Sequence, residues 1–317
     1  MNRHLALELA RVTEAAALES GRWVGKGDKI AADAAATAAM RHVLGTMDIY
    51  GTVVIGEGEM DEAPMLYIGE KVGNRKYQAV DIAVDPLEGT TLCAKGTNGA
   101  ITTIALAPAG GFLNAPDMYM DKIIVGPEGK GIIDIDAPPG ENLRRLAQAK
   151  RCNIADLTVV LLDRPRHNDI VADIRKAGAC IHMISDGDVA PAVATGIADS
   201  GIDMVLGIGG APEGVLAAAA VKCAGGDMQA RLIFTTDCER ERAPTMGITD
   251  PDKIYTLEEM ATGDVFFAAT GVTSGALLRG VRYSSGGART HSIVMRSRSR
   301  TVRFLDSFHY FDHKPLH

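Results

Sequence analysis

Long apolar runs, clustered cysteines and aromatic residues are all scarce in this chain of 317 residues. The longest apolar run, Val215 to Val221, is far short of the roughly 20 residues that a membrane helix needs, and no secretory signal pattern opens the sequence. The five cysteines are scattered and never form C-x-x-C, which argues against a disulfide framework or zinc–thiolate site and favours reduced thiols in the cytoplasm. Because aromatic residues make up only 5%, we do not expect stacking on bases or sugars to dominate recognition.

An excess of basic residues is absent as well. The chain has 33 Lys and Arg against 40 Asp and Glu, a net charge of −7, which argues against a dedicated nucleic-acid binder. An apolar content of 46% is typical of a soluble globular protein, and the length suggests about two domains or subdomains. A phosphate-handling enzyme that works through bound metal remains compatible with this charge.

The first half mixes helices and strands. We expect helices over 5–19, 30–44 and 141–150, and strands over 53–55, 78–84, 99–107 and 122–125. Because a turn-rich stretch at 137–140 precedes the last of these helices, we place a boundary near it. The predicted subdomains are residues 1–150 and 151–317.

The second half alternates regularly between strands and helices. The strands are expected at 157–162, 180–184 and 203–206, and the helices at 168–176, 189–198 and 215–224. This alternation indicates βαβ units and a largely parallel sheet. Since ligands bind at the carboxyl ends of such strands, the loops 163–167, 185–188 and 207–214 should line one opening.

The most specific motif is D-P-L-E-G-T-T at 85–91, which directly follows an apolar strand. Proline keeps Asp85 extended, and Glu88 comes three residues later, so both carboxylates can reach one small volume. Gly89 permits close backbone approach, and the amides of residues 89–91 can point at a phosphate. A solvent-exposed strand-to-helix turn is the alternative, and the full motif argues against it.

Three further segments are less specific. In G-E-G-E-M-D-E at 56–62, four acids in six positions repel one another unless water or a hard cation such as Mg²⁺ or Mn²⁺ compensates. Asp33, on an alanine-rich helix, has the local pattern of a surface residue. Glu213 follows the glycine-rich loop, which matches neither a P-loop nor G-x-G-x-x-G, so it either favours the helix dipole or binds a metal.

Other catalytic patterns are not found. His167, His182 and His291 lack H-E-x-x-H or related spacing and are expected to be packed or surface residues. Ser185 and Ser274 lack a G-x-S-x-G setting, so no serine-hydrolase elbow is predicted.

Together, these motifs resemble a known group. D-P-L-E-G-T-T resembles the signature of lithium-sensitive, metal-dependent sugar phosphatases, and its combination with G-E-G-E-M-D-E-A-P-M-L, the early G-K-G-D-K-x-x-A-D-x-A-A and the late G-I-G-G-A-P-E-G-V resembles bacterial class II fructose-1,6-bisphosphatase. The resemblance covers nearly the whole chain. It implies a mixed α/β, layered α-β-α-β-α sandwich with two subdomains, and hydrolysis of fructose 1,6-bisphosphate to fructose 6-phosphate and phosphate in gluconeogenesis.

The resemblance also implies roles for individual residues. The metal ligands, for two or three Mn²⁺ or Mg²⁺ ions, would be Asp33, Glu57, Asp85, Glu88 and Glu213. The residues needed for catalysis would be Thr90, Asp61 and Lys29. The substrate contacts would be Glu88, Gly89, Thr90, Tyr119, Arg164, Pro165, Arg166, Asp186, Gly187, Asp188 and Gly210. Position 164 is commonly lysine in the family, and arginine keeps the charge but changes the geometry.

The mechanism expected from these residues is attack by a metal-activated water on the 1-phosphate. Thr90 would orient the water, Asp33 or Asp61 would take its proton, and Arg166, with Arg164, would hold the distal phosphate. Asp186 and Asp188 would accept hydrogen bonds from sugar hydroxyls.

Two kinds of alternative remain open. Sedoheptulose 1,7-bisphosphate or an inositol phosphate could be the substrate within the same superfamily, although two basic residues set apart from the acids favour a bisphosphate. A polyanion-binding module is the alternative of another class, because seven arginines lie between Arg279 and Leu305 without an acidic residue, partly in an alternating stretch at 297–303 that suggests a strand. A solvated or intersubunit strand explains the same pattern, and the family resemblance implies a dimer or tetramer.

Overall fold

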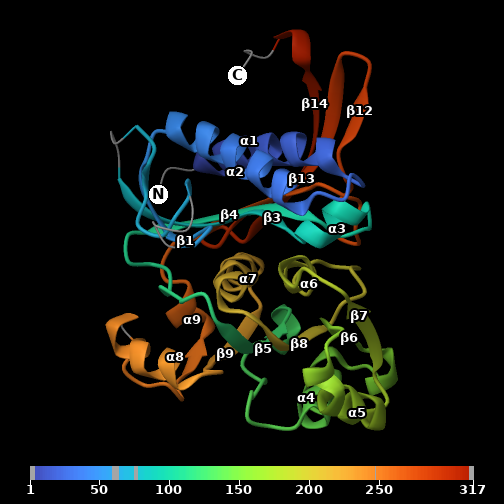
Figure 1. Cartoon of the computed structure of the whole chain (residues 1–317). Helices are drawn as coiled ribbons and strands as arrows, with labels where there is room; N and C mark the ends of the chain where they lie inside the picture. Colours follow the sequence, from blue (N-terminus) through green and yellow to red (C-terminus); the bar gives the residue numbers. More distant parts are fainter. Residues whose placement is uncertain (1–3, 59–63, 75–77, 247, 314–317) are drawn as a thin grey trace.

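Two β-sheets, each flanked by helices, make up the chain (Figure 1). The computed structural model describes residues 4–58, 64–74, 78–246 and 248–313. Within these residues the first sheet has eight strands, in the order β12-β13-β11-β4-β3-β1-β2 with β14 paired to β13, and the second has six, in the order β10-β9-β5-β8-β6-β7. No helix in the described part of the chain is long and apolar enough to cross a membrane.

The elements have the following bounds. The strands of the first sheet are β1 (Tyr50–Ile55), β2 (Lys71–Val72), β3 (Ala79–Glu88), β4 (Ile101–Pro108), β11 (Phe266–Gly271), β12 (Arg282–Ser284), β13 (Gly287–Arg296) and β14 (Thr301–Tyr310). Those of the second are β5 (Tyr119–Val125), β6 (Thr158–Leu162), β7 (Cys180–Ile184), β8 (Met204–Gly210), β9 (Asp227–Ile233) and β10 (Ile254–Thr256). The helices are α1 (Leu5–Ser20), α2 (Lys29–Thr46), α3 (Thr90–Lys95), α4 (Pro139–Lys150), α5 (Asn168–Ala177), α6 (Val189–Ala194), α7 (Ala211–Ala224), α8 (Asp237–Arg242) and α9 (Leu257–Met260).

The layers run α-β-α-β-α, as predicted. α1 and α2 cover the outer face of the first sheet, α6 and α7 lie between the sheets, and α4 and α5 cover the outer face of the second (Figure 1). Three apolar clusters fill the boundaries between the layers: one lies between the outer helices and the first sheet, one surrounds the central helices and reaches both sheets, and one lies between the second sheet and its outer helices. The predicted mixed α/β sandwich is confirmed.

Helix α7 is the central element of this stack. It contacts strands of both sheets, and its small residues, including the run Ala217–Ala220, are buried all round. A helix that is apolar on every side belongs in a core, because it has no face to offer to water. The start of α7 therefore faces the space between the two sheets, which is where Glu213 lies.

The second sheet is mixed rather than purely parallel. β6 pairs in parallel with β7 and β8, but β5 pairs antiparallel with both β8 and β9. β8, α7 and β9 therefore still form a βαβ unit, with β5 inserted between its two strands. The alternation predicted the common direction of β6 to β8, but β9 was not predicted, and the insertion of a distant segment is invisible to local patterns.

Several boundaries differ from the predicted ones: β1 and β5 each begin three residues earlier, β8 ends at Gly210 rather than at 206, and α7 begins at Ala211 rather than at 215. Three further differences have a local cause. β3 continues past Asp85 to Glu88, because a bulge takes up the proline between them. α6 ends at Ala194 rather than at 198, where tight turns through Gly196 replace the helical pattern. The predicted strand at 297–303 begins only at Thr301, because residues 297–300 form the turn between β13 and β14.

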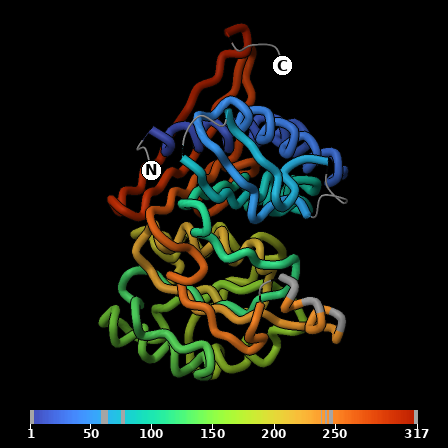
Figure 2. Tube along the Cα trace, turned by 90° about the vertical axis from the view of Figure 1, so that its left-hand side faces the viewer, coloured from blue at the N-terminus to red at the C-terminus, as the bar shows by residue number. Residues whose placement is uncertain are grey.

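Residue 150 does not separate the strands of the first sheet from those of the second. β5 already lies in the second sheet, while β11 to β14 return to the first (Figure 2, where the C-terminal hairpin lies beside the N-terminal helices). The subdomains predicted at 1–150 and 151–317 stay a prediction as folding units, but the sheets exchange strands across that boundary.

Candidate active site

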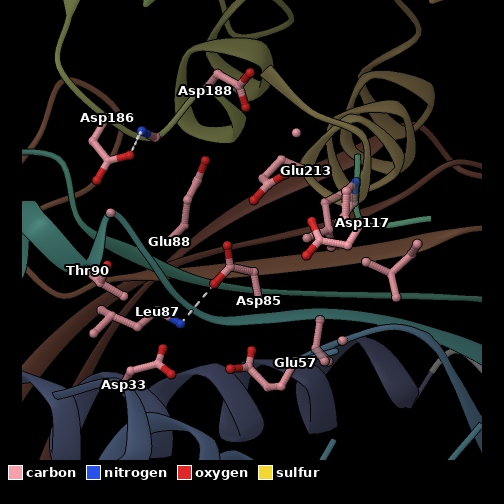
Figure 3. Close-up of a pocket in the computed structure, with 18 of the residues that line it drawn as sticks. Asp33, Glu57, Asp85, Leu87, Glu88, Thr90, Asp117, Asp186, Asp188 and Glu213 are labelled. Atoms are coloured by element: carbon pink, nitrogen blue, oxygen red, sulfur yellow. Dashed lines mark hydrogen bonds between the residues drawn. The ribbon is translucent and has the colours of Figure 1, made fainter. Parts of the chain in front are cut away.

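A cavity of about 410 Å³ lies between the two sheets. Its walls carry carboxylates from both sides (Figure 3). The acidic side chains that line it are Asp33, Glu57, Asp85, Glu88, Asp117, Asp186, Asp188 and Glu213. The loops that follow β6 and β7 and the junction of β8 with α7 all contribute lining residues, so the predicted common opening is confirmed. Residues 207–214, predicted as a loop, belong instead to the end of β8 and the start of α7.

The D-P-L-E-G-T-T motif forms the floor of the cavity. The register between β3 and β4 shifts between Asp85 and Glu88, so both carboxylates project into the same space. The Leu87 amide donates to Asp85 Oδ1 at 3.0 Å, which fixes that carboxylate, and α3 begins directly afterwards at Thr90. Gly89 has a φ of 81°, a conformation that favours glycine at this turn.

Glu88 connects the two halves of the molecule. Its Oε1 accepts a hydrogen bond of 2.7 Å from the Val189 amide at the start of α6, and the residue is only 4% exposed. Its second oxygen, Oε2, is buried without a hydrogen-bond partner among the described residues, and so is Glu213 Oε2. Buried carboxylate oxygens without partners are costly, and a bound cation would offset that cost.

Burial raises the pKa values of five of these acids, and repulsion between carboxylates adds to the rise at four of them. Burial, with further repulsion from Asp33 and Glu213, raises the pKa of Glu57 to about 8. The pKa values of Asp85 and Glu88 lie well above the ordinary range, again through burial and neighbouring carboxylates, and those of Asp33 and Glu213 are also raised by burial. A hard divalent cation would offset this repulsion directly.

The carboxylates of the cavity together suit metal binding, but they do not form a complete coordination shell for one ion. Among the described residues, no three acidic, cysteine or histidine side chains converge closely enough to hold one ion together. The donor set is made only of oxygens, which suits Mg²⁺ and Mn²⁺. The two unpartnered oxygens of Glu88 and Glu213 are the structural observation that supports a cation here.

Two arginines lie on the loop after β6, on the side of the cavity that faces the D-P-L-E-G-T-T motif. Arg164 lines the cavity and donates to the carbonyl oxygens of Asp163 (2.9 Å) and Ser185 (2.8 Å). Arg166 lies farther out, where it donates to the Ile208 carbonyl and its guanidinium sits 4.9 Å from the centre of the Tyr119 ring. The two arginines are therefore held at fixed places without a carboxylate partner in the described part of the chain.

His167 is packed, as predicted, and supports this side of the cavity. It is 1% exposed, and its Nε2 accepts a hydrogen bond of 2.8 Å from the Ile208 amide. Nδ1 lies 2.7 Å from the Leu162 carbonyl oxygen, so the proton belongs on Nδ1 and the ring is neutral.

Most of the predicted site residues meet at the cavity. Those that line it are Asp33, Glu57, Asp85, Glu88, Gly89, Thr90, Arg164, Asp186, Gly187, Asp188, Gly210 and Glu213. Tyr119, Pro165 and Arg166 lie next to this lining rather than in it, and Lys29 is exposed at the start of α2. The prediction for Asp61 lies outside the described residues.

Two residues at this site were missed from the sequence. Asp117 lines the cavity because the antiparallel β5 begins at the edge where β8 ends. Lys122 is buried behind the cavity wall and donates to Asp188. Asp117 had no local signal, whereas Lys122 did: it interrupts the alternation of buried apolar residues in β5.

Part of the arginine-rich C-terminal stretch is paired with acids. Arg279 and Arg289 both contact Asp306, at 2.5 and 3.3 Å, and Arg296 pairs with Asp264 at 2.6 Å. Both acids lie outside the acid-free stretch of the sequence. The other four arginines of the stretch, Arg282, Arg298, Arg300 and Arg303, are exposed. The pairing therefore reduces the positive charge that a polyanion would meet without removing it.

Comparison with known proteins gives one consistent result. A family model described as bacterial fructose-1,6-bisphosphatase, glpX-encoded, matches residues 3–309. The fructose-1,6-bisphosphatase 1 class 2 of Escherichia coli (strain K12) is 47% identical over 328 residues, which cover 99% of this chain and 97% of that protein. The D-fructose 1,6-bisphosphatase class 2/sedoheptulose 1,7-bisphosphatase of Synechococcus sp. (strain JA-2-3B'a(2-13)) is 46% identical over 337 residues, with 98% and 97% covered.

Proposed function

Because the chain belongs to the bacterial, glpX-encoded fructose-1,6-bisphosphatase family, we propose that it hydrolyses the 1-phosphate of fructose 1,6-bisphosphate to fructose 6-phosphate and phosphate. This reaction is a step of gluconeogenesis. The observation that carries the proposal is one cavity that is lined by a group of carboxylates and by Arg164, with Arg166 next to the lining. A sugar bisphosphate needs both the carboxylates and the arginines, one group for each of its phosphates.

The carboxylates of the cavity would hold two or three Mn²⁺ or Mg²⁺ ions. When bound, such ions polarise a phosphate and lower the pKa of a coordinated water. Asp33, Glu57, Asp85, Glu88 and Glu213 would provide the ligands, supported by their shared burial and raised pKa values. The strongest support for metal binding comes from Oε2 of Glu88 and Oε2 of Glu213, which have no hydrogen-bond partner among the described residues.

Thr90 would orient the attacking water through its hydroxyl group. It lines the cavity at the first residue of α3, two positions after Glu88, so its side chain reaches the same volume as the acids. Asp33 or Asp61 would take the proton of the water. Asp33 is supported by its position on the cavity wall and by a pKa raised through burial, which makes it a better base than an exposed aspartate. Lys29 and Asp61 remain candidates through the family resemblance.

The side of the cavity with the two arginines would bind the sugar and its distal phosphate. Arg164 and Arg166 would hold the 6-phosphate, with Pro165 fixing the turn between them and Tyr119 packed beneath Arg166. Asp186 and Asp188, on either side of Gly187, would accept hydrogen bonds from the hydroxyl groups. The backbone of Gly89 and of Gly210 would also contact the substrate.

Sedoheptulose 1,7-bisphosphate is a second candidate substrate. Two cyanobacterial relatives, at 46% and 45% identity, carry both activities in their names. An inositol monophosphate has no second phosphate for the two arginines and is disfavoured. A substrate panel tests these proposals: phosphate release with fructose 1,6-bisphosphate should far exceed release with inositol 1-phosphate, and equal rates would refute the assignment.

We also propose that the enzyme works in the cytoplasm as a homodimer or homotetramer. The family resemblance supports this, and so does the free edge of the first sheet, where Phe304, Phe308 and Tyr310 on β14 are exposed. Association would bury these rings. Analytical ultracentrifugation should give a multiple of the 33.5-kDa chain mass, and a monomer at assay concentration would contradict the proposal.

A further inference from the structure

A lysine occupies a core position in β5. Along this strand Met120 and Ile124 face the cluster around α7 and are 0% and 1% exposed. Lys122 stands between them on the same face and is only 2% exposed. Because alternate residues of a strand share a face, an apolar side chain is expected at this position. Lysine is almost never buried to this degree without a partner.

The ammonium group of Lys122 binds two segments that line the cavity. It donates to Asp188 Oδ2 at 2.5 Å and to the Gly210 carbonyl oxygen at 3.1 Å. Asp188 ends the loop after β7, and Gly210 ends β8 just before α7. The Lys122 ammonium group thus connects the loop after β7 to the end of β8 from behind the cavity wall.

The glycines around Lys122 leave room for this contact. A Cβ on Gly209 would collide with Asp188 Oδ2 and would lie 2.9 Å from Lys122 Nζ. A Cβ on Gly214 would lie 3.4 Å from Lys122 Cδ. The G-I-G-G-A-P-E-G segment therefore fits around the lysine as well as around the cavity.

Stability alone does not explain a lysine here. A buried ion pair that is replaced by apolar side chains of similar volume often leaves a protein as stable as before. Met120 and Ile124 show that this face of β5 accepts apolar residues. Asp188 also lies near two other carboxylates, Glu88 and Glu213, whose charges repel it. A carboxylate in that setting needs a cation to keep its place.

We propose that Lys122 is a positioning residue for sugar recognition, acting through Asp188. It occupies Oδ2, so Oδ1, which accepts no hydrogen bond from the described residues, is the oxygen left for a sugar hydroxyl. Its bond to the Gly210 carbonyl holds the start of α7 at a fixed distance from that oxygen. This inference rests on the proposed function, because it assigns a cause to the orientation of a proposed substrate contact.

A double-mutant cycle tests the inference. The variants are Lys122→Met, Asp188→Asn and the double substitution, and the readouts are KM for fructose 1,6-bisphosphate and Kd for fructose 6-phosphate by calorimetry. Lys222→Met is the matched control, since Lys222 also contacts a carboxylate (Glu258, 2.5 Å) and a carbonyl (Ala261, 2.6 Å) but lies at the far end of α7. p-Nitrophenyl phosphate, which has no sugar, serves as the control substrate.

Each single substitution at the pair should raise KM and Kd at least about tenfold, as expected for a lost hydrogen bond to a charged group. The double variant should be no worse than Asp188→Asn, because Lys122 acts through Asp188. In the variants of the pair, KM for p-nitrophenyl phosphate should rise much less than KM for fructose 1,6-bisphosphate, and the Lys222→Met values should match those of the wild type. If Lys122→Met alone does not fold, the comparison of the double variant with Asp188→Asn remains decisive.

Multiplicative effects in the double variant, or a Lys122→Met protein with lower melting temperature but normal KM and Kd, would overturn the inference. These outcomes leave wild-type turnover intact. Failure of the proposed function would instead appear as a wild type that releases no phosphate from fructose 1,6-bisphosphate, so the two failures are distinguishable.

Discussion

The metal-free protein should lose stability as the pH rises from 5 to 7, and Glu57→Gln should remove much of this loss. Burial and repulsion from Asp33 raise the pKa of Glu57 from 4.5 to about 8. The folded state therefore holds this proton more tightly than the unfolded state. The contribution of Glu57 to stability is complete below pH 4.5 and is lost progressively up to about pH 8.

The magnitude follows from the width of that window. One pH unit inside it corresponds to about 1.4 kcal/mol, so Glu57 alone should lower the free energy of unfolding by about 2.5 kcal/mol between pH 5 and 7. For a chain of this size that is about 5 °C in Tm. Asp33, Asp85, Glu88 and Glu213, whose pKa values are also raised, act in the same direction.

Other titrating groups do not confuse the comparison. Acids with lowered pKa values, such as Glu259 at about 2, are ionised over this range in the folded state and mostly ionised in the unfolded state, and they are the same in wild type and variant. His291 acts in the opposite direction, because burial and nearby arginines lower its pKa and make protonation unfavourable in the folded state. It is present in wild type and variant alike, so the difference between them isolates the cavity.

Thermal melts in excess chelator at pH 5 and pH 7 measure the effect. Glu57→Gln should show a drop in Tm smaller by about 5 °C than that of wild type, whereas Glu128→Gln, an exposed glutamate away from the cavity, should behave like wild type. Added Mn²⁺ at pH 7 should raise the wild-type Tm, by about 2.7 kcal/mol in stability at a hundred times its Kd. A chelated wild type that is equally stable at both pH values, or a Glu57→Gln protein with the wild-type drop, would refute the reasoning.

Three further outcomes are expected. Thr90→Ala should lower kcat by roughly a hundredfold or more while Mn²⁺ and substrate still bind, whereas Thr91→Ala should leave kcat unchanged. Steady-state assays and Mn²⁺ calorimetry measure both effects. Normal turnover of the Thr90→Ala protein would contradict the role of Thr90. Arg166→Ala should raise KM for fructose 1,6-bisphosphate at least about tenfold but leave that for p-nitrophenyl phosphate unchanged; a parallel rise for both would place the distal phosphate elsewhere. Gly210→Ala should weaken Mn²⁺ binding by about tenfold or more in calorimetry, because its Cβ would overlap the Glu213 carboxylate, and normal affinity would contradict the assignment of Glu213.

Local chemistry made part of the site predictable. Asp85 and Glu88 come from one strand end, and their three-residue spacing already places both carboxylates in one volume, as the bulge in β3 shows. The loops after β6 and β7 and the end of β8 share an opening because parallel strands end at one edge. In each case the relevant residues are close in sequence or related by a regular repeat.

Long-range contacts made the rest unpredictable from local pattern. Asp33 has the sequence of a surface helix residue and reaches the cavity only because α2 packs on the first sheet. Glu213 reaches it because α7 fits between the sheets, and only the family resemblance identified either residue. β5 lies between β8 and β9 although it precedes them by many residues, and this insertion brings Asp117 and Lys122 to the site. The lysine left a trace in the alternation of β5, and Asp188 lies in a loop already expected at the opening, but no local pattern shows that the two residues pair.

The central claim is that a metal-loaded carboxylate cavity hydrolyses the 1-phosphate of fructose 1,6-bisphosphate. The most direct measurement is formation of fructose 6-phosphate by the purified protein after chelation and again after Mn²⁺ or Mg²⁺ is restored. We expect no product in chelator and stoichiometric fructose 6-phosphate and phosphate once the metal returns. Full activity in chelator would contradict the metal site, and restored metal without fructose 6-phosphate would contradict the proposed reaction.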